Sequence, residues 1–134
     1  MDAKSPPTPA ELTILIAGAV MLVGSFFSFA GSTNAWGTFL FPLATLLPLY
    51  GVLMAAQIAV TKFAELRLPG RIAGFSWEQA HLVIGLLAGL MALGWLFTDI
   101  ANKGIGYWLE VLGGIVIASG AIALQHERNA GPIR

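Results

Sequence analysis

The chain has 134 residues, of which 57% are hydrophobic and only 10% are charged, and its mean hydropathy is +0.79. Soluble domains carry roughly 25% charged residues, so this composition argues against an ordinary soluble domain and favours an integral membrane protein surrounded by the lipid bilayer. Seven basic residues balance seven acidic residues, which argues against nucleic acid as a partner, and the absence of cysteine excludes disulfides and thiolate chemistry.

The first ten residues contain three prolines, and we expect residues 1–10 to form a flexible, cytoplasmic N-terminal segment. Residues 12–30 follow without a charge and are long enough to cross a bilayer, so they predict the first membrane span. Gly24 lies on a side of this span that is rich in small residues. Residues 28–30 resemble a signal-peptide cleavage site, but the apolar run is longer than a usual signal sequence, and we expect it to be retained.

Residues 38–60 predict the second span, after a short uncharged loop. Pro42 and Pro48 both fall within it, and a proline in a helix interior removes a backbone hydrogen bond. We therefore expect a kink at these prolines, either as a static bend that suits the bundle or as a gating hinge.

Residues 61–78 are the longest connection, with a Pro69-Gly70 turn, and we expect them to lie at the level of the lipid headgroups. Residues 80–98 predict the third span, in which Gly85 and Gly89 form a GxxxG pair that permits close helix contact. His81 begins this span and is interpreted as an interfacial histidine, with a pH-sensing role as the alternative.

Residues 105–125 predict the fourth span, with residues 127–134 as a cytoplasmic tail. Glycines recur in this span every seven residues and predict a face for close helix packing: Gly106, Gly113 and Gly120. Glu110 falls on the same side of the helix. An acid inside an apolar span is costly, so we expect it to face protein or a water-filled cavity rather than lipid.

These elements predict an all-α membrane protein, an up-down bundle of four transmembrane helices spanning residues 11–126. An even number of spans places both termini on one side of the membrane. Six basic residues gather on that side, whereas the opposite side has only Lys103. The positive-inside rule then places both termini in the cytoplasm. The six residues are Lys4, Lys62, Arg67, Arg71, Arg128 and Arg134.

No catalytic set, phosphate-binding loop or metal-ligand cluster is evident in the sequence, so we expect no enzyme activity, no cofactor and no metal. Glu110 is the one candidate for an intramembrane polar site. Lys103 and Asp99 precede it by short distances along the chain and could approach it. The site is interpreted as a hydrogen-bonding anchor between helices, with a proton or cation site as the alternative. Gln57, within the second span, is similarly interpreted as a polar contact between helices.

Two stretches, GSFFSFAGSTNAW at the end of the first span and KGIGYWLEVLGGIVIASGAIAL as the last span, make the chain resemble small four-helix integral membrane proteins of actinobacteria. In those proteins the first span ends in a Ser-Phe-Leu-Pro-Trp-like stretch, and here Ser25–Phe29 lacks the Pro-Trp. The resemblance implies this architecture and a bacterial cell membrane, and it implies no activity, cofactor or catalytic residue.

The resulting functional hypothesis is a non-enzymatic structural or accessory membrane protein. It would associate with itself or with a larger membrane complex through its small-residue helix faces. The alternative is an oligomeric channel or proton-coupled transporter that uses Glu110.

Overall fold

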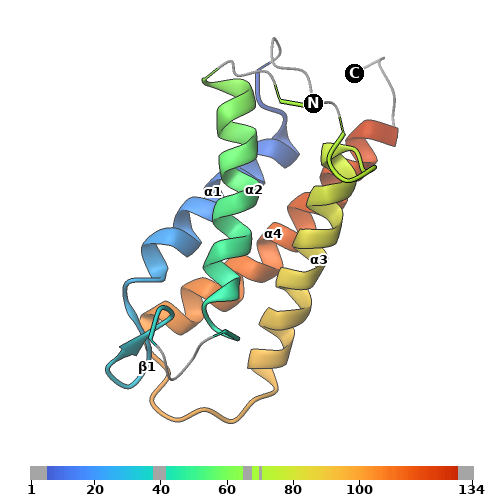
Figure 1. Cartoon of the computed structure of the whole chain (residues 1–134). Helices are drawn as coiled ribbons and strands as arrows, with labels where there is room; N and C mark the ends of the chain where they lie inside the picture. Colours follow the sequence, from blue (N-terminus) through green and yellow to red (C-terminus); the bar gives the residue numbers. More distant parts are fainter. Residues whose placement is uncertain (1–5, 38–41, 65–67, 70, 130–134) are drawn as a thin grey trace.

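A computed structural model describes residues 6–37, 42–64, 68–69 and 71–129. Within these residues the chain is mostly helical and has four helices and one small two-stranded sheet (Figure 1). The elements in chain order are α1 (Pro9–Gly24), β1 (Ser28–Ala30), β2 (Thr33–Asn34), α2 (Leu46–Lys62), α3 (Trp77–Leu96) and α4 (Ile105–Asn129).

Two of the helices begin with reciprocal capping boxes that are visible in the sequence. The Thr8 side chain accepts from the backbone N–H of Glu11, and the Glu11 carboxylate accepts from the backbone N–H of Thr8. Ser76 and Gln79 make the same pair of bonds at the start of α3. Such caps satisfy backbone N–H groups that have no partner within the helix, and this fixes where α1 and α3 begin.

The four helices alternate in direction, so one end of the bundle collects the start of α1, the end of α2, the start of α3 and the end of α4 (Figure 1). Polar contacts join these helix ends. Lys62 pairs with Glu11, and Arg128 pairs with Glu78. Glu127 also accepts from the backbone N–H of Ala10, which ties the end of α4 to the start of α1.

The opposite end is closed by the β1–β2 hairpin, which lies against the loop before α4 (Figure 1). The backbone N–H of Gly104 donates to the carbonyl of Phe29, and the N–H of Gly31 donates to the carbonyl of Asn102. Phe29 is fully buried and packs edge-on against Trp95 and Tyr107, with ring centroids 4.9 and 5.2 Å apart. This aromatic cluster anchors the hairpin to α3 and α4.

Helix α4 lies against both α1 and α3, and glycines set the closeness of the contacts. A Cβ added to Gly85 would stand 2.6 Å from the Cβ of Ala121, and one added to Gly89 would stand 2.8 Å from the Cβ of Ala118. On the other side of α4, a Cβ on Gly120 would stand 2.9 Å from Ile14. These separations leave no room for a side chain, so glycine is what allows the helices to approach.

The first two helices differ in extent from the predicted spans. Helix α1 ends at Gly24 and not at residue 30, because the chain turns there into the hairpin that buries Phe29. Helix α2 begins at Leu46, so Pro42 precedes it and Pro48 stands in its first turn. Proline is tolerated in the first turn of a helix. These two prolines therefore do not form the kink that was expected in a helix interior. Residues 38–41, where the second span was expected to begin, lie outside the described residues.

Two helices, α3 and α4, are long and apolar enough to cross a membrane. Helices α1 and α2 have 16 and 17 residues. At about 1.5 Å per residue they measure roughly 25 Å, somewhat less than the hydrocarbon core of about 30 Å.

Candidate functional site

Glu110 is fully buried in the interface between α4 and α1. Its carboxylate lies opposite Gly24, and a Cβ on that glycine would stand 2.9 Å from Oε2 of Glu110. Neither carboxylate oxygen has a hydrogen-bond partner within the part of the chain that the structure describes. The acid therefore faces protein, and the missing side chain of Gly24 provides its space.

Lys103 and Asp99 are not joined to Glu110. Both side chains are exposed, and neither forms an ion pair with Glu110 in the described part of the chain. The ammonium of Lys103 instead lies 5.6 Å from the centroid of the Tyr107 ring, within range of a cation–π contact. The predicted three-residue site is thus reduced to one buried acid, with its neighbours at the bundle surface.

Ser25, which follows Gly24 in the chain, forms a polar contact with Trp36. The Trp36 indole donates to the Ser25 hydroxyl at 2.8 Å, and that hydroxyl donates to the carbonyl of Leu22. Ser25 is fully buried directly after Gly24. Its only hydrogen is used on Leu22, so it cannot donate to the Glu110 carboxylate, and its bond with Trp36 ties the segment after the hairpin to the end of α1.

A second buried polar site lies at the other end of the bundle, between α2 and α3. His81 is 2% exposed, and its Nε2 lies 2.8 Å from Oε1 of Gln57. The side-chain amide of Gln57 donates to the Thr61 hydroxyl at 3.1 Å, and that hydroxyl donates to the backbone carbonyl of Gln57 at 2.9 Å. His81 is therefore a buried member of an interhelical network, and its interpretation as a histidine exposed at the interface is wrong.

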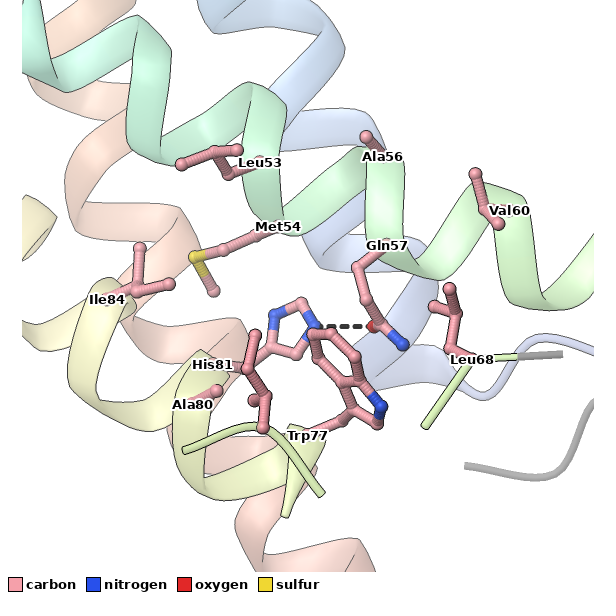
Figure 2. A pocket seen from close by; sticks show the side chains of 11 residues that line it. Leu53, Met54, Ala56, Gln57, Val60, Leu68, Trp77, Ala80, His81 and Ile84 are labelled. Carbon is pink, nitrogen blue, oxygen red and sulfur yellow. Dashed lines mark hydrogen bonds between the residues drawn. The ribbon is translucent and has the colours of Figure 1, made fainter. Parts of the chain in front are cut away.

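A cavity of about 410 Å³ opens beside this network (Figure 2). Its walls come from one face of α2, one face of α3 and the segment that connects them. Apart from Gln57 and His81 they consist mostly of apolar side chains, among them Leu53, Met54 and Ile84. The Trp77 indole donates to the carbonyl of Pro69 at 2.7 Å, which fixes the connecting segment over one end of the cavity. This volume falls within the range of roughly 300–1,000 Å³ that is typical of small-molecule sites.

A third polar contact, Lys62 with Glu11, is buried where α1 meets α2. The Lys62 ammonium lies 3.4 Å from Oε1 of Glu11, and the two side chains are 2% and 1% exposed. The same carboxylate oxygen accepts from the backbone N–H of Thr8. The role of this pair is structural, because the two charges are paired with each other and join α1 to α2.

Three features were not predicted from the sequence: the His81–Gln57 bond, the cavity and the Lys62–Glu11 pair. Each polar residue was visible as an exception within or beside an apolar span. Their pairing depends on which helices become neighbours, and sequence spacing alone does not supply this. No group of three or more His, Cys, Asp or Glu side chains is close enough to hold a metal ion within the described residues.

The structure thus defines a four-helix bundle with a cavity lined by apolar residues and His81 at one end. At the other end lies a buried acid, Glu110, that has no partner among the described residues. Comparison with known protein families, curated proteins and solved structures finds no match to the chain.

Proposed function

We propose that this is a non-enzymatic integral membrane protein of the bacterial cell membrane, with a structural or accessory role in association with itself or a larger membrane complex. The chain crosses the membrane four times in this proposal, with both ends in the cytoplasm.

The apolar exterior of the bundle carries the membrane assignment. Large hydrophobic side chains stand outward on every helix, with exposed fractions of 63% at Ile16, 58% at Leu53, 67% at Leu90 and 55% at Leu112. Several ionisable groups are instead buried, among them Glu11, Lys62 and Glu110. In water such a surface promotes association, whereas lipid chains cover it without cost.

An accessory role is supported by how the small residues are used. Six predicted packing glycines contact other elements of the same chain: Gly24, Gly85, Gly89, Gly106, Gly113 and Gly120. Gly94 differs, since no atom of the described residues lies within 4 Å of a Cβ added there. It shares an outward α3 face with Leu86 and Leu90, and this face offers a partner helix a close approach.

The absence of cysteine from the sequence makes the topology directly testable. Single-cysteine variants at Ala101, in the α3–α4 loop, and Ala64, after α2, should be labelled from opposite sides of sealed membrane vesicles. The chain should also stay in the membrane after alkaline carbonate washing. Labelling of both positions from one side, or release by carbonate, would contradict the proposed four crossings.

Association is tested at the outward α3 face. Leu90→Cys should give a disulfide-linked dimer, or a crosslink to another membrane protein, on mild oxidation of native membranes. Ile16→Cys provides a matched exposed control on α1. A chain that remains monomeric and forms no crosslink at Leu90 would contradict association through this face.

The buried acid supports an alternative, an oligomeric channel or a proton-coupled transporter that uses Glu110. The supporting observation is the complete burial of a carboxyl group without a partner among the described residues, because such groups inside membranes mark ion and proton pathways. Purified chain in liposomes should then conduct protons or cations, and Glu110→Gln should abolish the flux while the bundle stays folded. Absence of flux in the unmodified protein would rule this alternative out.

A further inference from the structure

The cavity between α2 and α3 has mostly apolar walls, and one buried hydrogen-bonding atom of a wall residue has no partner within the described part of the chain. That atom is Nδ1 of His81. Figure 2 shows it on the side of the ring away from Gln57, towards Met54 and Ile84, which also line the cavity. A buried polar atom without a partner destabilises the folded chain. A ligand group that forms a hydrogen bond with it removes this penalty, which favours binding.

The hydrogen-bond network determines what kind of group this is. The Thr61 hydroxyl donates its only hydrogen to the backbone carbonyl of Gln57. Toward the Gln57 side chain it can therefore only accept a hydrogen bond. The amide nitrogen of Gln57 must therefore face Thr61, and its oxygen must face His81. An amide oxygen only accepts, so Nε2 of His81 carries the hydrogen. In the neutral ring Nδ1 is left as an acceptor, and the ligand group that fits it is a donor.

The rest of the cavity defines the remainder of the ligand. Among the residues that the structure describes, His81 is the only ionisable side chain that lines the cavity. Leu53 and Ile72 also line it and are 58% and 45% exposed, so the cavity opens to the outside of the bundle. A charged group would lose its hydration without finding a counter-charge. Met54, on the Nδ1 side of the ring, has an unbranched and adaptable side chain that can shift to admit a small group.

We propose that the α2–α3 cavity binds a neutral, long-chain lipid alcohol, whose hydroxyl donates to Nδ1 of His81 and whose chain lies along the apolar walls. Gln57 positions the ring by fixing its tautomer. The proposal rests on the proposed membrane location only in that the ligand enters from the lipid phase.

Photocrosslinking in detergent tests this without reference to membrane topology. The full chain is titrated with dodecanol carrying a mid-chain diazirine, and the labelled peptides are identified by mass spectrometry. The same diazirine probe as a methyl ether provides the matched control, because an ether accepts but cannot donate. Saturable labelling should map to α2 and α3, and the alcohol should bind about three- to tenfold more tightly than the ether, as one hydrogen bond would give.

Two variants separate occupancy from hydrogen bonding. Ala80→Phe fills the cavity and should reduce labelling about tenfold, whereas Leu112→Phe, at an exposed position on α4, should leave it unchanged. The double variant His81→Phe/Gln57→Leu removes both polar partners together, so it leaves no orphaned group to unfold the chain. It should still be labelled and should bind alcohol and ether equally.

Three results would overturn the proposal: equal affinity for alcohol and ether in the unmodified chain, labelling that Ala80→Phe does not reduce, or labelling spread over the outer faces of α1 and α4. The proposed membrane role fails separately, through carbonate release or one-sided cysteine labelling.

Discussion

Gly24 and Glu110 face each other across the α1–α4 interface, and a Cβ on the glycine would stand 2.9 Å from the carboxylate oxygen of the acid. The two positions therefore depend on each other, because the glycine provides the space that the acid occupies. The same glycine brings α1 close to α4 at Leu109, whose Cβ would lie 2.7 Å from that added atom. The buried acid is thus part of a packed interface and does not line an open pathway within the described bundle.

The first prediction concerns the energetic cost of this acid. Glu110→Met keeps an unbranched side chain of similar length and removes two buried oxygens without a described partner. We expect the free energy of unfolding to rise by about 1–3 kcal/mol, because an unsatisfied buried polar group is lost. Reversible unfolding in mixed micelles by stepwise addition of sodium dodecyl sulfate measures it. A loss of stability would instead show that the carboxyl group has a stabilising partner.

The second prediction concerns the glycines of the α3–α4 interface. Gly85→Ala places a methyl group 2.6 Å from the Cβ of Ala121, so the helices must separate or shift. We expect it to reduce the free energy of unfolding by about 1–3 kcal/mol, the usual cost of overpacking.

Gly94→Ala is the matched control on the same helix, because the structure describes no atom within 4 Å of the added methyl group. We expect it to be neutral or to stabilise the helix by up to about 1 kcal/mol, since alanine favours helix over glycine. The same micelle titration measures both variants, and equal effects of the two would contradict the close packing at Gly85.

The third prediction concerns the buried pair of Lys62 and Glu11. Lys62→Met removes the ammonium and leaves the carboxylate buried, which we expect to cost about 3–5 kcal/mol of unfolding free energy. Adding Glu11→Gln removes the remaining charge and keeps a residue that can complete the capping box with Thr8. The double variant should recover most of the loss, and a double variant as unstable as Lys62→Met alone would contradict a buried charge pair.

The fourth prediction concerns the bond between His81 and Gln57. His81→Phe and Gln57→Leu each leave one buried partner unsatisfied, so each should cost about 1–3 kcal/mol. The double variant should cost less than the sum of the two, with a coupling energy of about 0.5–3 kcal/mol. A double-mutant cycle of micelle unfolding measures the coupling, and strict additivity would show that the two side chains do not interact.

Much of the fold follows from the sequence, because helix formation depends on local features. Four apolar segments predict four helices, and four helices are present among the described residues. Two of them, α3 and α4, are long and apolar enough to span a membrane. The third span was predicted from residue 80, whereas α3 begins at Trp77, after a capping box of Ser76 and Gln79 whose spacing is a local sequence signal.

Only the tertiary structure decided where α1 ends and which polar residues meet. Phe29 lies within the apolar run that was predicted to continue the first helix to residue 30. Its ring instead packs against Trp95 and Tyr107, because the chain turns into a hairpin after α1. Glu110 is visible in the sequence as an exception, but its position opposite Gly24 and its separation from Lys103 depend on the α1–α4 packing. The His81–Gln57 bond and the cavity beside it likewise require α2 and α3 to be neighbours. Helix formation depends on interactions between residues a few positions apart, so the sequence can predict it. Contacts between residues distant in the sequence depend on how whole helix faces pack against each other.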